Sequence, residues 1–223
     1  MSKNVLFIMC DQLRWDYLSC AGHPNLQTPH IDALAARGVR FDRAYVQSTI
    51  CGPSRMSFYT GRYVSSHGST WNNIPLKIGE MTLGDHLRPL GIRTALCGKT
   101  HMTADVEGMK RLGLAPDSKI GALVSECGFE PYERDDGLHP NSDYGTRNEN
   151  YDQYMKDRGW EDENPWDSVA NSGEDEDGNI LSGWFLDNSD LAARAADEDS
   201  ETPYLTRRAM DFIQEAAETP WCL

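Results

Sequence analysis

The chain has 223 residues, of which 39% are hydrophobic and 25% are charged, as is usual for a globular protein. This length suffices for one full α/β domain or for most of a larger one. No apolar run is long enough to span a membrane, and the apolar run near the start is too short for a signal peptide. We therefore expect a cytoplasmic protein with no membrane partner.

The formal net charge of −14 is concentrated in one segment of the chain. Residues 130–200 hold 21 of the 35 acidic residues but only 5 of the 21 lysines and arginines. The remainder is nearly balanced, and no basic stripe is visible in it. A nucleic-acid partner is therefore not expected.

The cysteines indicate neither a zinc knuckle nor a thioredoxin motif, because none of them has C-x-x-C spacing. They are Cys10, Cys20, Cys51, Cys97, Cys127 and Cys222. Without an export signal they should be mostly reduced thiols. Only Cys51 has neighbours that indicate chemistry.

The first elements in chain order predict a strand, a helix and a strand. Residues 5–9 form a continuous apolar run, as in a strand buried on both faces of a parallel sheet. Asp11 then lies beyond the carboxyl end of this strand, where α/β folds place their sites. Residues 29–37, with proline first and Gly38 after the last residue, predict a helix. Residues 39–46 alternate in polarity and predict a second strand.

The next elements continue the alternation. A short helix is expected to open at Pro53 and to close at Gly61. Residues 82–90 predict a further helix, which a proline interrupts late. Residues 92–97 predict a third buried strand, and residues 98–101 leave its carboxyl end. This order is typical of an α/β sheet.

The rest of the chain predicts an insertion followed by a return to the sheet. Residues 104–200 are rich in acidic residues, glycine and asparagine, with aromatic residues between them, which indicates a loop-rich but packed acidic insertion. Pro203 starts a helix that should end near Thr219, and Trp221 opens another buried strand. Because a strand of three residues is no finished edge, we expect the protein to continue beyond Leu223.

One short motif carries most of the chemical information. Residues 51–55 read C-G-P-S-R, and T-G follows at residues 60–61. This resembles the sulfatase signature C-x-P-S-R followed by T-G. The resemblance implies that Cys51 is oxidised to formylglycine by a formylglycine-generating enzyme and that the hydrate is the nucleophile. It also implies that Arg55 stabilises the formylglycine oxygens and the metal-binding carboxylates through paired hydrogen bonds.

The chemistry of a geminal diol fits this role. Beside a divalent cation, one hydroxyl can lose a proton, attack sulfur or phosphorus and form a covalent ester. The second hydroxyl then expels the bound group as the aldehyde re-forms. The alternative is an unmodified Cys51 thiol, whose pKa a helix N-terminus would lower.

The residues around Asp11 resemble the first sulfatase strand, which delivers a metal-binding aspartate at its end. Carboxylate oxygens suit a hard divalent cation, and Ca²⁺ or Mn²⁺ is expected before Mg²⁺. With Cys51, Asp11 is expected to contact this metal. Many sulfatases have a second aspartate next, whereas this chain has Gln12, as in phosphonate monoester hydrolases. Gln12 is therefore expected to contact the substrate.

A third motif, G-K-T-H over residues 98–101, resembles the second sulfatase signature. The resemblance implies that Lys99 supplies fixed positive charge and that His101 donates to the leaving oxygen. Phosphonate monoester hydrolases usually lack this pair, so it favours sulfate esters. By analogy with those hydrolases, Asn72 is expected near the substrate, although Asn73 could equally be the relevant residue.

The resemblance as a whole implies residues 1–223 as the N-terminal part of a catalytic domain. Its fold would be alkaline-phosphatase-like α/β, with a mostly parallel central sheet flanked by helices on both faces. The expected reaction is hydrolysis of small sulfate esters, with phosphonate monoesters and phosphodiesters as side substrates. The family's other metal ligands lie downstream of this chain, and the full-length protein is expected to form a homo-oligomer. Two alternatives stay open, a phosphonate monoester hydrolase and a non-catalytic fragment.

Overall fold

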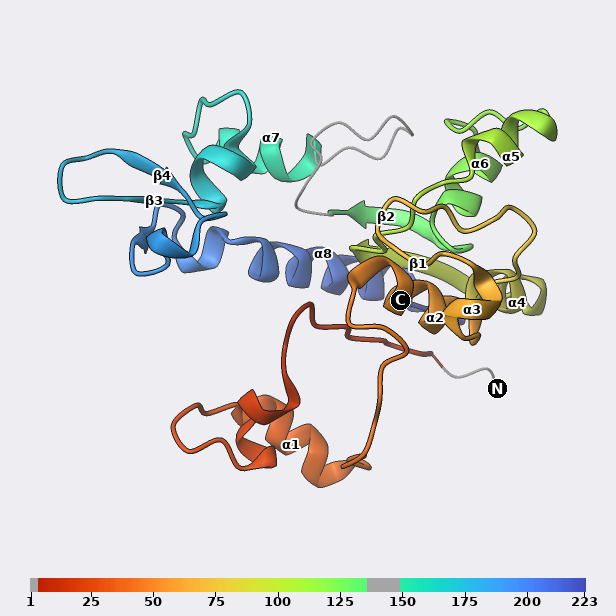
Figure 1. Ribbon diagram of the computed structural model, residues 1–223, viewed down its shortest axis with the longest axis horizontal. Helices are drawn as coiled ribbons and strands as arrows, with labels where there is room; N and C mark the ends of the chain where they lie inside the picture. The colour runs from red at the N-terminus through yellow and green to blue at the C-terminus, as the bar shows by residue number, and fades with distance from the viewer. Residues whose placement is uncertain (1–3, 136–148) are drawn as a thin grey trace.

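The fold is built on a parallel sheet in the computed structural model, which describes residues 4–135 and 149–223 (Figure 1). Its strand order is β2-β1-β6, and β1 pairs in parallel with both neighbours. The strands are β1 (Arg93–Gly98), β2 (Glu130–Arg134) and β6 (Trp221–Cys222). Val5 forms a parallel bridge to Cys222, so the start of the chain extends the sheet beyond β6.

The helices and a second, small antiparallel sheet surround this sheet. The helices are α1 (Pro29–Arg37), α2 (Cys51–Thr60), α3 (Val64–His67), α4 (Leu83–Leu87), α5 (Val106–Arg111), α6 (Lys119–Ser125), α7 (Glu149–Asp157) and α8 (Glu201–Glu215). The small sheet has the order β4-β3-β5, with β3 (Ser172–Glu174), β4 (Ile180–Ser182) and β5 (Ala192–Ala193). Within the described residues, no helix has both the length and the apolar character that crossing a membrane requires.

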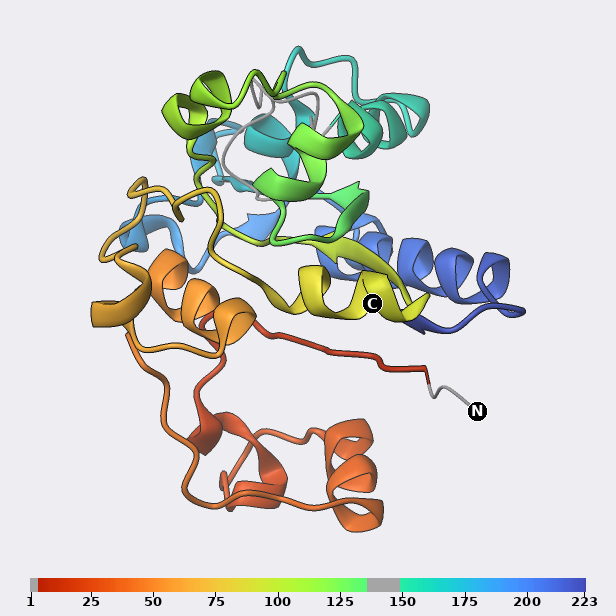
Figure 2. The ribbon, with the colours of Figure 1, turned by 90° about the vertical axis from the view of Figure 1, so that its right-hand side faces the viewer.

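Helices cover both faces of β1. Leu96 packs in one core cluster with Met56 and Tyr59 of α2. Ala95, whose side chain points to the opposite face, packs with Phe212 and other residues of α8. Figure 2 shows α2 and α8 on the two sides of the sheet. The predicted fold class, a parallel sheet flanked by helices on both faces, is confirmed.

All four predicted helices and two of the four predicted strands are present. α1 lies between Thr28 and Gly38 as predicted. α2 begins two residues earlier than predicted, at Cys51, and α8 likewise begins at Glu201. The predicted helix over 82–90 is α4 followed by a 3₁₀ turn at Arg88–Leu90 that contains the proline.

The prediction of a doubly buried strand over residues 5–9 is wrong. Val5 and Phe7 make backbone hydrogen bonds to Trp221 and Leu223, but Ile8 is 76% exposed. The physical reason is that other elements do not pack against both faces of this segment. Phe58 of α2 touches Phe7 on one side, with ring centroids 5.3 Å apart, whereas the segment carrying α1 lies away from the sheet (Figure 2).

The prediction of a strand over residues 39–46 is also wrong. Val39 is 79% exposed and Tyr45 is 82% exposed. Within the described part of the chain, no other strand makes backbone hydrogen bonds with these residues. Polarity alternation alone cannot form a strand without a partner that satisfies its backbone groups.

The range 104–200 contains more regular structure than a loop-rich insertion. Its first part includes β2, which belongs to the main sheet, together with α5 and α6. Its later part packs with Tyr204 of α8 around a second core of aromatic and aliphatic residues, which are Tyr151, Met155, Trp166, Val169 and Ala195. Residues 136–148 of the predicted insertion lie outside the described residues.

Candidate active site

Cys51 is the first residue of α2 and is half-buried. The residue before it, Ile50, stands at the N-cap position and has no side-chain group that could accept from the helix N–H groups. Asn72, distant in sequence, takes over this task, because its Oδ1 accepts a 2.8 Å hydrogen bond from the N–H of Gly52. The first turn of α2, and with it Cys51, is thus tied to the loop that contains Asn72.

A charged cluster joins three segments of the chain next to α2. Lys99 Nζ lies 2.8 Å from Asp11 Oδ2, and Arg55 Nη2 lies 3.4 Å from Asp11 Oδ1. Arg55 Nη1 also donates a 2.6 Å hydrogen bond to the backbone carbonyl of Lys99. Arg55, only 7% exposed in its side chain, therefore holds the ends of residues 5–11 and of β1 together.

The electrostatics of the cluster favour the ionised form of Asp11. Partial burial by itself raises the pKa of this carboxyl group, because it disfavours charge. The hydrogen bond and the charge of Lys99, together with Arg55, outweigh that effect, so the pKa of Asp11 is lowered overall. Asp11 is thus a carboxylate near neutral pH, matched by two cationic side chains.

A cavity of about 500 Å³ opens beside this cluster. Asp11, Gln12, Cys51 and Arg55 all line it, so four of the seven predicted site residues share one cavity. Gln12 adopts a left-handed backbone conformation, with φ 58°. Residues 45–50 form another wall, which the sequence analysis did not single out. Because these residues directly precede the Cys51 motif, their position in the sequence could have indicated that they line the same cavity.

The other three predicted site residues lie around this cavity without lining it. Lys99 donates a hydrogen bond to Asp11, which lines the cavity. Asn72 accepts a hydrogen bond from the N–H of Gly52 in the first turn of α2. The backbone carbonyl of His101 lies 3.6 Å from the position that a Cβ on Gly52 would take. The residues after β1 therefore pack directly against the first turn of α2. The three motifs, far apart in sequence, meet at the carboxyl end of the sheet.

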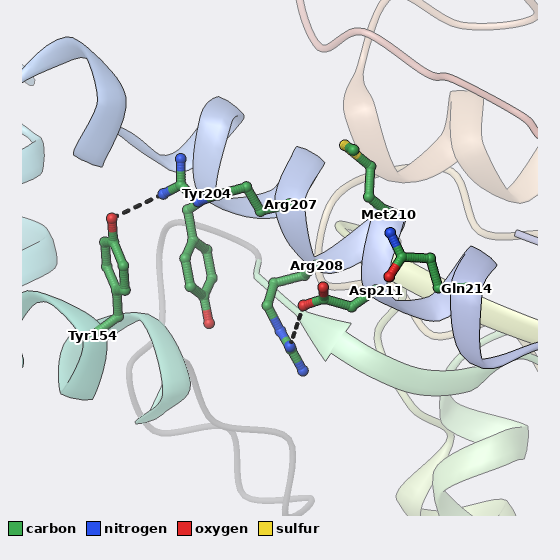
Figure 3. Close-up of a pocket in the computed structure, with 7 residues that line it drawn as sticks. All are labelled: Tyr154, Tyr204, Arg207, Arg208, Met210, Asp211 and Gln214. Atoms are coloured by element: carbon green, nitrogen blue, oxygen red, sulfur yellow. Dashed lines mark hydrogen bonds and ion pairs between the residues drawn. The ribbon is translucent and has the colours of Figure 1, made fainter.

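A second cavity, of about 320 Å³, lies along α8 and contains none of the predicted site residues (Figure 3). Its two arginines are engaged by neighbouring groups. Arg207 Nη2 donates to the hydroxyl of Tyr154 at 2.8 Å, and Arg208 pairs with Asp211 at 2.8 Å. The first cavity is therefore the better candidate for chemistry.

The described residues do not by themselves form a site for a divalent cation. They contain no group of three or more His, Cys, Asp or Glu side chains arranged to hold a metal. Ca²⁺ takes six to eight oxygen ligands. Asp11 offers one carboxylate, and both of its oxygens already face cationic side chains.

Sequence comparisons agree with these motifs. An ulvan-active sulfatase of Formosa agariphila is 34% identical over 116 residues, which cover 52% of this chain and 22% of that protein. Human arylsulfatase A is 36% identical over 113 residues, covering 47% of this chain and 22% of the relative. The chain thus spans about a fifth of the length of these curated relatives.

A structural comparison extends the similarity over the whole fold. The phosphonate monoester hydrolase of Silicibacter pomeroyi superimposes with a TM-score of 0.75 and 26% identity. The match covers 99% of this chain and 40% of that protein. The family model for sulfatases matches residues 3–221, which is nearly the entire chain. This chain therefore belongs to the sulfatase family.

Proposed function

We propose that this chain carries the nucleophile-bearing part of an enzyme that hydrolyses sulfate esters. The observation that carries the proposal is the charged cluster of Arg55, Asp11 and Lys99 next to α2. Arg55 and Asp11 of this cluster line one cavity together with Cys51. Fixed positive charges next to a nucleophile at a helix start favour the binding and reaction of an anionic ester.

The proposed nucleophile is formylglycine, made from Cys51 by a formylglycine-generating enzyme. One hydroxyl of its hydrate gives up a proton and attacks sulfur, while the bond between sulfur and the ester oxygen breaks. His101 donates the proton that the departing alcohol requires. The remaining hydroxyl then loses its proton, the carbon–oxygen bond to sulfate breaks, and the aldehyde re-forms.

Lys99 and Arg55 provide the positive charge for this reaction. Lys99 is 18% exposed in its side chain, so its ammonium group can reach solvent-borne anions while staying fixed by Asp11. In the partly buried site, such charges interact with a developing negative charge more strongly than in water. Gln12 lines the cavity and is proposed, with Asn72 next to Gly52, to orient the ester.

A divalent cation, Ca²⁺ or Mn²⁺, is part of the proposal, with Asp11 as one ligand. Since the described residues supply no complete ligand set, other parts of the protein would have to contribute the remaining ligands. When bound, the metal would supply Lewis-acid polarisation of the ester oxygens.

Phosphonate monoester hydrolysis is the second candidate function. The similarity to the Silicibacter hydrolase over 99% of this chain favours it. The presence of both Lys99 and His101 favours sulfate esters instead. Sulfate and phosphonate monoesters share a negative charge and a tetrahedral centre, so one site can accept both.

Two measurements test the proposal on protein purified from its native host. Mass spectrometry of the peptide that contains Cys51 should find an aldehyde or its hydrate in place of the thiol. Rates on aryl sulfates and matched aryl phosphonates should then favour the sulfate. An unmodified thiol together with loss of activity on alkylation would support the thiolate alternative. A clear preference for the phosphonate would establish the second candidate.

A further inference from the structure

We propose that Thr100 and the buried ion pair between Glu126 and Arg134 are positioning residues for Lys99 and His101. Thr100 lies between these two residues in sequence, and it is fully buried. The inference rests on the proposed function, since it assigns to these residues the task of orienting the groups that act on the ester.

The contacts of Thr100 hold the backbone after β1 in place. Its hydroxyl donates a 2.6 Å hydrogen bond to Glu126 Oε2 and accepts a 3.2 Å hydrogen bond from the N–H of Met102. On the other side, Arg55 donates to the carbonyl of Lys99 at 2.6 Å. Arg55 therefore holds the Lys99 end of this segment, and the hydroxyl of Thr100, itself bound to Glu126, holds the Met102 end.

The backbone of this segment needs such support. His101 has a φ of 54°, in the left-handed region that residues with a Cβ rarely adopt. Strained conformations of this kind persist where surrounding contacts hold them, and they occur often at functional sites. The hydroxyl of Thr100, one residue before His101, accepts from the N–H of Met102, one residue after it, and so spans this turn.

Glu126 is held in turn by an ion pair at the same edge of the sheet. Arg134 Nε lies 2.6 Å from Glu126 Oε1, and their side chains are 9% and 3% exposed. Arg134 is the last residue of β2 and lies opposite Gly98, the last residue of β1. The arginine thus reaches Glu126 from the strand end next to the Lys99 segment.

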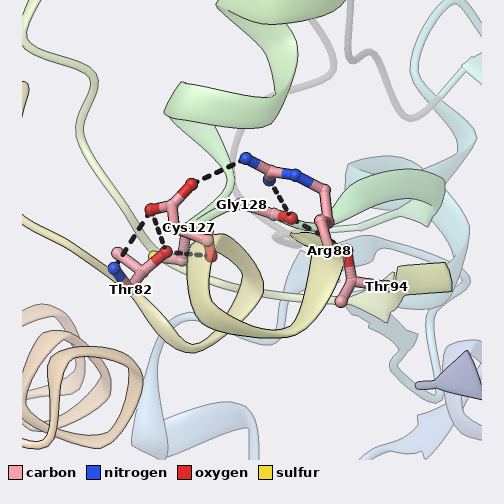
Figure 4. Close-up of polar contacts among 6 residues, drawn as sticks. Thr82, Arg88, Thr94, Cys127 and Gly128 are labelled. Atoms are coloured by element: carbon pink, nitrogen blue, oxygen red, sulfur yellow. Dashed lines mark hydrogen bonds and ion pairs between the residues drawn. The ribbon is translucent and has the colours of Figure 1, made fainter. Parts of the chain in front are cut away.

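The chain on the other side of Glu126 is fixed by α4 (Figure 4). The hydroxyl of Thr82 donates to the carbonyl of Cys127, and Arg88 Nη1 donates to the carbonyl of Gly128. Gly84 packs so closely that a Cβ on it would lie 2.3 Å from Gly128 O. These contacts leave Glu126 little freedom, so its carboxylate is a fixed acceptor for Thr100.

A buried charge pair costs desolvation energy, and in some proteins such a pair serves to specify one conformation. Here the specified conformation is that of the turn carrying Lys99 and His101. If His101 protonates the leaving oxygen, loosening this turn should matter most for esters whose alcohol leaves poorly.

The test compares Thr100→Val with Thr100→Ser and with the matched control Thr94→Val. Thr94 is also buried, and its hydroxyl donates to Gly128 O, which keeps the hydrogen bond from Arg88. Hydrolysis of phenyl sulfate and para-nitrophenyl sulfate is measured on the mature enzyme. Amide hydrogen exchange is measured on the peptide around Met102.

For Thr100→Val, we expect kcat to fall about 10- to 100-fold on phenyl sulfate and less than about threefold on the better leaving group. The Met102 amide should exchange faster. Thr100→Ser should restore both properties, and Thr94→Val should change neither.

Four other outcomes are informative. Equal losses on the two esters, or unchanged exchange in Thr100→Val, would overturn the proposal. Faster exchange of the same peptide in Thr94→Val would also overturn it, since general destabilisation would then explain the effect. If the unaltered mature enzyme cleaves neither sulfate while Thr100→Val still speeds exchange, the positioning stands and the proposed function fails.

Discussion

Cys51 shows how a residue's local surroundings are completed by distant parts of the chain. The motif that contains it opens α2, but Ile50 at the N-cap cannot accept from the helix N–H groups. Asn72 supplies the acceptor for Gly52 instead. This contact gives Asn72 a role in holding the first turn of α2. The neighbour, Asn73, adopts a left-handed turn conformation with φ 67°.

Asp11 leads to a prediction on pH-dependent stability. Since the pKa of Asp11 is lowered in the folded chain, its ionised form stabilises the fold above the unfolded pKa near 3.8. That contribution is lost as the pH falls through the lower folded-state pKa. Because Asp11 is 40% exposed, Asp11→Asn should reduce the free energy of unfolding by about 0.5 to 1 kcal/mol near neutral pH.

Urea unfolding between about pH 3 and pH 7 measures this difference. The gap between the two proteins should be constant above about pH 5 and should shrink below about pH 4. Asp42→Asn is the control, because that carboxylate pairs with Arg40 but is 72% exposed. A gap that widens in acid would contradict the assignment of the Lys99 and Arg55 contacts to Asp11.

At the scale of elements, α4 and the turn before β2 approach each other through backbone. Gly84 and Gly128 make this possible, because neither has a side chain to separate the two segments. Gly128 also has a φ of 79°, which favours glycine. The contact lies just before the start of β2, and Gly128 is only two residues from Glu126.

Gly84→Ala should therefore be strongly destabilising. The new Cβ would lie 2.3 Å from Gly128 O, and relief requires a backbone shift that costs about 3 kcal/mol. The control is Gly68→Ala, where φ is 76° but no atom lies within 4 Å, so about 1 kcal/mol of conformational strain is expected. Chemical denaturation of both variants measures their free energies of unfolding. Equal losses of stability in the two variants would argue against the close contact between Gly84 and Gly128.

At the scale of the molecule, the segment with the excess negative charge is separate in sequence from the segment that holds the candidate site residues. Residues 130–200 hold most of the acidic residues, whereas the predicted site residues lie between Asp11 and His101. In the described parts of the chain, the acidic side chains do not gather into a metal-binding group. The carboxylate that faces the cavity, Asp11, is next to two cations.

This arrangement predicts weak cation binding by the 223-residue chain alone. Calcium should bind with a dissociation constant above about 1 mM, because one cation-paired carboxylate cannot replace the hydration shell of the ion. Isothermal titration calorimetry measures it directly. Stoichiometric binding in the micromolar range would show that the chain holds a cation site the described residues do not reveal. Comparison with Asp11→Asn would then show whether that site includes Asp11.

The sequence by itself determined the motifs and the elements whose signals are local. Both ends of α1 and the C-terminal end of α2 follow from proline and glycine at set positions, and the buried run of β1 follows from its apolar residues. The family resemblance follows from residues 51–55 and 98–101. Each of these features depends only on residues within a few positions of one another in the sequence. They can therefore be predicted without knowing the tertiary structure.

Tertiary structure decided everything that depends on a partner. Residues 5–9 and 39–46 have strand-like patterns, yet neither is covered on both faces, because burial requires another element to pack there. The pairing of Asp11 with Lys99, the capping of α2 by Asn72 and the support of Thr100 by Glu126 join residues far apart in sequence. No spacing encodes such contacts, since they exist only once parallel strands bring their carboxyl ends together.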